Sequence, residues 1–288
     1  MGRSNATRQP LTRAVRSSAA SAAAFAVFSC LAAAGCSEHG AIADGRSSGD
    51  PARMARAVRD AADGLVKSGS SAARTAMQMN SGGTRVTVRG TGGFDYGARR
   101  GRLDIVLPQS GPGGGGRERP APIRELYAAG ALYMKNRGAG VPSDKWLRLD
   151  TTELADGNLV TNGATDPLTA AELLRGAGKV TCDGQDRLRG DTVRHCSGTT
   201  DIGRAAKAAS AYARGSLEAA AKGFAKDSVP FDAYLDDDGR LRKVRYEFAF
   251  AQQQEVEVVS TTEIYGFGEP VKVALPADGD IYAGKVEP

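Results

Sequence analysis

Alternation of apolar and polar residues with a period of two recurs along the chain and limits the folds open to it. In Thr84–Arg89, Val86 and Val88 alternate with charged and hydroxyl side chains, and Leu103 and Ile105 do the same further on. Short turns separate such stretches, so the pattern predicts an antiparallel sheet with one apolar and one solvated face. The predicted strands are Ala76–Asn80, Thr84–Arg89, Gly93–Tyr96, Leu103–Leu107, Ile123–Tyr127, Ala131–Lys135, Lys145–Asp150, Lys179–Cys182, Thr192–Ser197, Val229–Leu235, Leu241–Phe250 and Glu255–Thr262.

Three helices are predicted between these strands. Asp50-Pro51 and Asp166-Pro167 each place an N-cap residue before a proline at the first helical position, and apolar residues follow at helical spacing. The second of these helices should end at Gly176. The Ala-rich stretch Asp201–Lys226 predicts a third helix, broken or kinked near Gly215. Strands and helices together predict an α+β fold.

The N-terminus has the pattern of an export signal. Four arginines and no acidic residue precede an Ala-rich apolar stretch, Ser17–Ala34, which ends in Ala33-Ala34-Gly35-Cys36. This ending resembles a bacterial lipobox, with Ala33 where Leu is common, and it predicts lipidation of Cys36 by acyl chains such as palmitate. A transmembrane anchor and an ordinary secretory signal are the alternatives, but the apolar stretch is short for a span and contains four serines.

These features predict three parts in the chain. Residues 1–35 would be a lipoprotein signal peptide, residues 36–49 a Gly/Ser-rich flexible tether, and residues 50–288 a single folded domain. The expected location is the extracytoplasmic face of the cell membrane, with the protein held by its lipid anchor. Without the four arginines of the signal, 34 basic residues face 33 acidic ones, so the sequence indicates no nucleic-acid partner.

Two cysteines, Cys182 and Cys196, remain once Cys30 leaves with the signal and Cys36 is lipidated. Outside the cytoplasm such a pair predicts a disulfide, and both residues fall on adjacent predicted strands. A zinc site that includes His195 is the alternative. It lacks a fourth ligand and the short Cys–Cys spacing that zinc sites favour.

Motifs for catalysis are weak throughout. His195 is the one histidine of the folded part that could act as a general base, and Gly45–Gly49 matches Gly-x-Ser-x-Gly only inside the tether. The glycine run in Gln109–Pro120 opens no helix, which a phosphate-binding loop requires. Asp236–Gly239 predicts a hairpin turn rather than a calcium loop. The sequence therefore predicts a non-enzyme without metal or cofactor, with a hydrolase based on His195 as an alternative.

The order of these elements resembles the LolA/LolB-type fold of the LppX/LprG group of actinobacterial lipoproteins. The resemblance implies a strongly curved antiparallel half-barrel whose concave face is covered by helices, with an apolar cavity for acyl chains between them. It is carried by the lipobox at Cys36, Leu132–Lys135, Lys145–Leu149, the helix start at Asp166-Pro167, the hairpin Cys182–Thr200, Val229–Asp236 and Tyr265–Val271.

The resemblance implies a protein that binds or carries a lipid or another hydrophobic ligand and does not catalyse a reaction on it. The alternative is a protein-interaction or envelope-structural module, with an envelope protein as partner, in which the same side chains form a closed core. Met side chains would suit a cavity for flexible chains because they adapt their shape. The cavity candidates are Met77, Met79, Val86, Val88, Phe94, Leu103, Ile105, Leu132, Met134, Leu147, Leu149, Phe231, Tyr246 and Phe248.

Overall fold

The computed structural model describes residues 50–81, 83–108, 121–224, 226–251 and 255–284. All of these fall in one compact unit, Ser47–Pro288. The predicted signal peptide (1–35), the tether (36–49) and the glycine-rich stretch Gln109–Pro120 lie outside the described residues.

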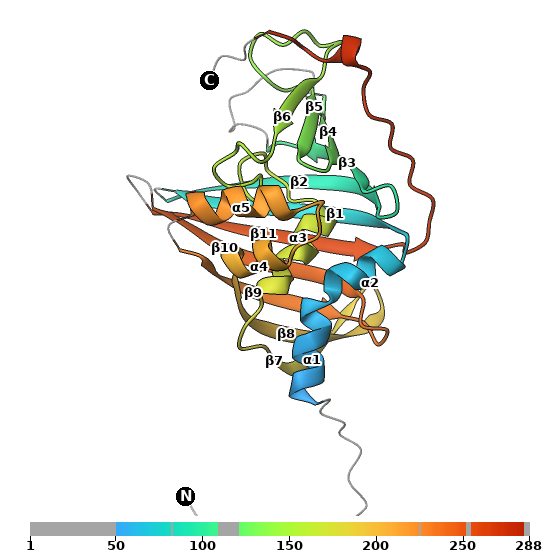
Figure 1. Ribbon diagram of the computed structural model, residues 1–288, viewed down its shortest axis with the longest axis vertical. Coiled ribbons are helices and arrows are strands. Elements are labelled where there is room, and N and C mark those ends of the chain that lie inside the picture. Colours follow the sequence, from blue (N-terminus) through green and yellow to red (C-terminus); the bar gives the residue numbers. More distant parts are fainter. Residues whose placement is uncertain (1–49, 82, 109–120, 225, 252–254, 285–288) are drawn as a thin grey trace, which may run out of the picture. The chain divides into compact units, whose positions relative to one another are not determined.

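Most of the unit is one antiparallel sheet of eleven strands that does not close into a barrel (Figure 1). The strand order is β6-β5-β4-β3-β2-β1-β11-β10-β9-β8-β7, so β6 and β7 are the edges and the first and last strands of the chain pair at the centre. The strands are β1 (Ser70–Ser81), β2 (Thr84–Asp95), β3 (Arg100–Val106), β4 (Ile123–Ala128), β5 (Ala131–Lys135), β6 (Leu147–Asp150), β7 (Thr181–Leu188), β8 (Asp191–Asp201), β9 (Ser228–Leu235), β10 (Leu241–Ala251) and β11 (Glu255–Tyr265).

Every predicted strand overlaps an observed one, but several bounds differ. Strand β7 runs from Thr181 to Leu188 where Lys179–Cys182 was expected, and β8 and β11 extend to Asp201 and Tyr265. Strand β1 begins at Ser70 rather than Ala76, and β2 is one strand where the sequence suggested two. The glycines inside β2 caused this last error. A Cβ at Gly92 would lie 1.9 Å from the carbonyl oxygen of Arg102 on β3, so this glycine permits close strand packing instead of ending the strand.

Helices begin where the caps predict. Asp50 accepts a hydrogen bond from the backbone N–H of Ala52, and Asp166 accepts from those of Leu168 and Thr169. The Ala-rich stretch is interrupted, but at residues 209–213 rather than near Gly215, and the next helix starts at Arg214. The helices are α1 (Pro51–Arg59), α2 (Ala61–Lys67), α3 (Pro167–Leu173), α4 (Ile202–Ala208) and α5 (Arg214–Gly223), with short 3₁₀ turns η1 (Leu174–Gly176) and η2 (Asp278–Asp280).

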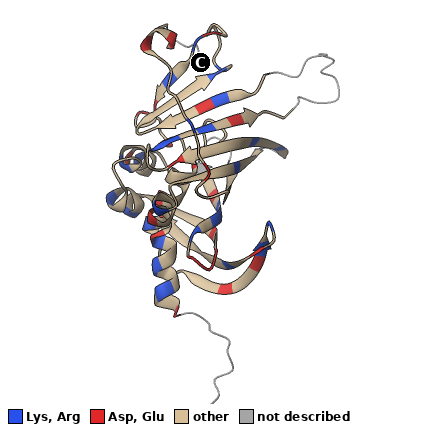
Figure 2. Ribbon diagram, turned by 90° about the vertical axis from the view of Figure 1, so that its right-hand side faces the viewer, with Lys and Arg blue, Asp and Glu red and all other residues tan. Residues whose placement is uncertain are grey.

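The helices lie on one face of the sheet (Figures 1 and 2). Helices α2 and α3 contact β10, α3 also contacts β11, and α4 contacts β8. The apolar face of the sheet is thus covered, and one core cluster joins the two layers. Among the described residues, no helix combines the length and the apolar character that a membrane span requires.

One segment runs through the middle of this core. In residues 156–177, which we call the inner segment, every residue is buried except Thr161 and Arg175. The segment contains α3 and η1 and lies between the sheet and the helices α4 and α5, since α3 contacts β10 and β11 on one side and α4 on the other. It also contains buried polar residues, which sets it apart from an ordinary core helix.

The chain after β11 returns to the far edge of the sheet (Figure 1). The backbone N–H of Gly268 donates to Ser70 O at the start of this path. At its end the backbone of Trp146, next to the edge strand β6, donates to Asp280 O and accepts from the N–H of Tyr282, both at 2.8 Å. The C-terminal segment therefore pairs with the chain at the β6 edge in parallel fashion.

Candidate functional site

The fourteen predicted cavity residues all lie on the helix-covered face of the sheet. Cross-strand partners share a face, and the register links Val88, Met77 and Ser260 in one row and Val86, Met79 and Val258 in another. Further rows connect the rest, such as Leu103, Glu125, Met134 and Leu147. We call this face the inner wall. Period-two alternation was sufficient to assign these side chains to one face.

Eleven of the fourteen residues are buried in the core, and Met79, Val86 and Leu149 are half-buried. The inner segment packs over the wall. The Tyr246 hydroxyl donates to Ala170 O of α3 at 2.6 Å, and a Cβ at Gly163 would lie 3.0 Å from Val88. Neither of the two cavities described below is lined by any of the fourteen. In this structure these side chains pack against protein.

The apolar wall is least covered at one end of the strands. Met79 and Val86 are direct cross-strand partners near the β1–β2 turn, and Val256 lies on the same face of β11; all three are half-buried. We call these three residues the apolar rim. Beside it Phe224, at the end of α5, packs on Phe248 with ring centroids 5.4 Å apart. The rim therefore continues into the buried wall.

A carboxyl group interrupts the wall on β4. Glu125 is fully buried, and the Tyr127 hydroxyl donates a short hydrogen bond to Glu125 Oε2. Glu125 Oε1 has no hydrogen-bond partner among the described residues. Burial raises the pKa of Glu125 to about 7, against the lowering effects of the Tyr127 hydrogen bond and the charge of Arg137.

Sequence reasoning missed Glu125, although a signal was present. In Ile123–Ala128 the period-two pattern places Glu125 on the same face as Ile123 and Tyr127. Only the strand's position in the sheet reveals that this face is the inner wall. The cross-strand neighbours of Glu125 are Leu103 and Met134, two of the predicted cavity residues.

A second buried acid belongs to the inner segment. Asp166 caps α3, and burial raises the pKa of its carboxyl against the hydrogen bonds of Thr169 and Tyr212. Burial and the charge of Asp166 together raise the pKa of Tyr212 well above its usual value. A void of about 20 Å³ is bounded by these residues, Tyr127 and Ser216, among others. Such a polar void has room for about one water molecule.

A larger groove lies on the surface between residues 152–155 and α5. It has a volume of about 490 Å³ and is open to solvent. Its lining includes Glu153, Glu218 and Lys222 and has nearly equal polar and apolar parts. Backbone contact closes one end, where a Cβ at Gly223 would lie 1.8 Å from Ala155 O. This mixed and shallow lining does not match a long apolar chain.

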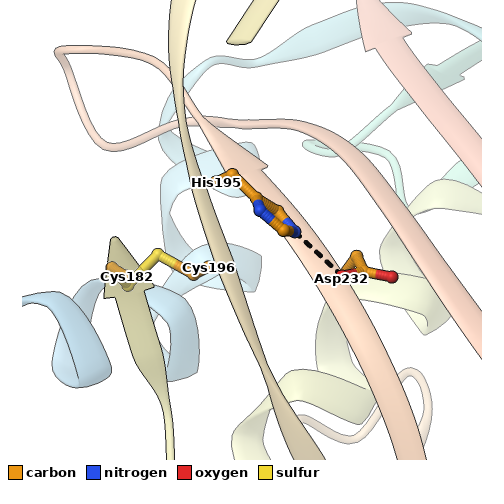
Figure 3. Close-up of a disulfide and its surroundings, with 4 residues drawn as sticks. All are labelled: Cys182, His195, Cys196 and Asp232. Carbon is orange, nitrogen blue, oxygen red and sulfur yellow. Dashed lines mark hydrogen bonds and ion pairs between the residues drawn. A yellow bond between two sulfur atoms is a disulfide. The ribbon is translucent and has the colours of Figure 1, made fainter. Parts of the chain in front are cut away.

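The predicted disulfide between Cys182 and Cys196 is confirmed (Figure 3). It joins edge strand β7 to β8, and because the two sulfur atoms are bonded to each other, the zinc alternative is wrong. His195 points to the other side, where its Nε2 lies 2.8 Å from Asp232 Oδ1 and its ring stacks on Tyr234. Among the described residues, no hydrogen bond links the His195 ring to a hydroxyl or thiol. No group of three or more His, Cys, Asp or Glu side chains there could hold a metal ion.

Comparison with known proteins gives likeness of fold at low identity. No protein-family model matches the chain, and no curated protein matches its sequence. Lipoprotein LppX of Mycobacterium tuberculosis is similar to it over 78% of this chain and 100% of that one, with 12% identity and a TM-score of 0.48. LprF of Mycobacterium bovis is similar over 80% of this chain and 100% of that one, with 14% identity and a TM-score of 0.42.

A third similar structure is a putative outer membrane lipoprotein-sorting protein domain of Vibrio parahaemolyticus. The likeness covers 77% of this chain and 95% of that one, with 9% identity and a TM-score of 0.32. The structural neighbours thus include two mycobacterial lipoproteins and a lipoprotein-sorting domain.

Proposed function

We propose that this protein is an extracytoplasmic, membrane-anchored lipoprotein that binds a lipid or another hydrophobic ligand and carries out no chemistry on it. One observation carries the proposal. The apolar residues of the inner wall, which Glu125 interrupts on β4, extend to a rim that is only half-buried at Met79, Val86 and Val256. Exposed apolar surface that continues into a core is a common mark of a ligand entrance.

In this proposal the helices cover a concave face of the sheet, and ligand tails enter at the rim. The tails take the place of part of the inner segment against the wall. Three side-chain hydrogen bonds tie this segment to the sheet: Tyr246 to Ala170 O at 2.6 Å, Thr200 to Leu173 O at 2.5 Å, and Thr165 to Ser260 at 3.4 Å between the hydroxyl oxygens. A β-bridge between Ala177 and Thr200 holds the end of the segment on β8. Displacement of the segment therefore breaks few hydrogen bonds to the wall.

The anchor is part of the same proposal and rests on the sequence around Cys36. Changing Cys36→Ser should move the protein from the membrane fraction to the soluble extracytoplasmic fraction. Full membrane association of the variant would contradict the anchor without bearing on ligand binding.

Uptake of a fluorescent fatty acyl probe tests the ligand site. Met79→Glu places a charge at the rim and should weaken probe binding about tenfold or more, because the charge must be desolvated when a tail enters. Val106→Glu is the matched control, since Val106 lies on the opposite face of β3 near the same strand ends and is 58% exposed. Equal probe binding by the wild type and both variants would mean that the probe does not bind at the rim.

Native mass spectrometry of the protein purified from its own host gives an independent readout. A bound amphiphile that is lost in Met79→Glu would support the proposal. Absence of both a bound amphiphile and probe uptake by the wild type would overturn it.

A second candidate is an interaction or envelope-structural module with a filled interior. It is favoured by the burial of eleven wall residues beneath the inner segment. Cross-linking on membranes followed by purification discriminates between the two. One dominant protein partner without co-purified lipid favours the filled module.

A further inference from the structure

Glu125 occupies a position in the inner wall that its packing does not explain. Its side chain has no exposed surface, and its neighbours in the row across the strands are Leu103, Met134 and Leu147. Tyr127 satisfies one carboxyl oxygen, and the other is without a partner among the described residues. An orphaned buried oxygen is destabilising, so a group that offers it a hydrogen bond would be bound there.

The charges around Glu125 restrict what that group can be. No ion pair among the described residues includes Glu125, although the charge of Arg137 acts on it. The positive charge of Arg137 repels a cationic ligand group, such as an ammonium head group. The acids Glu125 and Asp166 oppose a carboxylate or a phosphate; Asp166 lies close enough to raise the pKa of Tyr127 through its charge. An uncharged donor meets neither repulsion.

The path from the rim to Glu125 fits an extended tail. Gly92 on β2 pairs with Leu103 on β3, and Leu103 pairs with Glu125 on β4, so these three residues form one row across the strands. The rim residue Val86 lies on β2, six residues before Gly92. Six strand residues span about 20 Å, which is the length of a long acyl chain in extended form.

We propose that Glu125 binds the polar end of the ligand and that the preferred ligand is an uncharged lipid with a hydroxyl group, which donates its hydrogen bond to Glu125 Oε1. This inference rests on the proposed function and adds the head-group chemistry to it. Near neutral pH the buried carboxyl is partly protonated, because burial raises its pKa to about 7, so the site does not require a cationic ligand.

Two probes that differ in one hydrogen-bond donor test the assignment. 1-Hexadecanol and its methyl ether compete with the fluorescent acyl probe for the full-length protein. One hydrogen bond to a carboxyl group corresponds to a preference for the alcohol of about tenfold in the wild type. Glu125→Met should bind both probes within about a factor of two of each other, with no loss in ether binding.

Two further variants make the result specific. Glu125→Gln keeps the shape of the side chain; its amide oxygen accepts from Tyr127 and its NH₂ faces the ligand, so the preference for the alcohol should also disappear. Glu257→Met changes an exposed glutamate on the outer face of β11 and should keep the tenfold preference.

The outcomes separate the two proposals. A wild type that binds both probes equally, or a Glu125→Gln variant that keeps the preference, overturns the head-group assignment and leaves the proposed function standing. A wild type that takes up the fluorescent acyl probe but binds neither competitor also overturns only the head-group assignment. A wild type that takes up no acyl probe and carries no amphiphile overturns the proposed function together with this inference.

Discussion

The inner face of the central strands β1, β2, β10 and β11 and the inner segment 156–177 are both largely buried, but different interactions hold them. The strands pair in continuous registers of up to twelve residues, and their inner face is mainly apolar. The inner segment has little regular structure, and side-chain acceptors satisfy part of its backbone. Asp156 alone accepts from the N–H groups of Asn158, Val160 and Thr161. Both regions bury apolar side chains, but backbone ladders hold the sheet, whereas buried carboxylates satisfy part of the backbone of the segment.

The largest expected effect concerns Asp156, which is 4% exposed. Asp156→Ala leaves three backbone donors without an acceptor, so the free energy of unfolding should fall by about 4 kcal/mol. Chemical denaturation measures it. Asp150→Ala is the control, because Asp150 accepts from the N–H and the hydroxyl of Thr152 in a similar local turn but is only half-buried. A comparable loss in the two variants would contradict the distinction between sheet and segment.

The disulfide provides the corresponding test in the sheet. It closes a loop between residues 14 apart, and its removal should lower the free energy of unfolding by about 3 kcal/mol. The double variant Cys182→Ala/Cys196→Ala and the reduced wild type should give the same loss. Hydrogen exchange should show the reduced protection in β7 and β8. Faster exchange in the inner segment instead would mean that the two regions unfold as one unit.

The pH dependence of stability tests the acid in the wall. The pKa of Glu125 is higher in the folded state than in the unfolded state. Its contribution to the free energy of unfolding is therefore fully present below the unfolded pKa of 4.5 and is lost as the pH rises to about 7. The loss amounts to about 3 kcal/mol between pH 4 and pH 8. The groups that act on Glu125 are Tyr127 and Arg137, and the raised pKa of Asp166 adds an effect of the same sign.

Glu125→Gln isolates the part that is due to Glu125. The difference in unfolding free energy between variant and wild type should grow with pH over this range, while the contribution of Asp166 cancels. A difference independent of pH would show that Glu125 keeps an ordinary pKa in the fold.

The smallest expected effect concerns the contact between the two regions. Tyr246→Phe removes the hydrogen bond from the wall to Ala170 O and should lower the free energy of unfolding by about 1 kcal/mol. If ligand tails displace the inner segment, the variant should also take up the acyl probe faster. Slower uptake would mean that the segment supports the binding site rather than covering it.

Sequence patterns predicted the sheet better than the layer above it. Period-two alternation located the strands but missed the first half of β1. There the core-facing residues are Ser71, Ala73 and Thr75, and such small or polar side chains do not produce a clear apolar alternation. The inner segment shows the converse: Asn158, Asn162 and Asp166 have the composition of a surface loop and are buried. Their hydrogen bonds to Asp156, Asn158, Leu168 and Thr169 are local, as in a surface loop, so the sequence does not reveal that other elements bury them.

The same limit applies to the candidate site. Alternation assigned the fourteen wall residues to one face, but whether protein or ligand covers that face depends on the segment opposite. Glu125 could be assigned to the wall only once β4 was placed between β3 and β5. The interruption of the Ala-rich helix at residues 209–213 likewise accompanies the burial of Tyr212 beside Asp166, a contact between residues distant in sequence.

Pairing of β1 with β11 has a consequence for how the protein is made. Strands β1 to β6 and β7 to β11 each follow one another through neighbouring antiparallel pairs, so each half can assemble as its residues emerge. Among the described strands, the two halves of the sheet pair through Ala72–Asn80 and Glu257–Tyr265, nearly 190 residues apart in the chain. Contacts so distant in sequence form slowly. Most of the polypeptide must therefore be synthesised before the sheet can be completed, and an unjoined half exposes a bare β-edge to chaperones and proteases in the meantime.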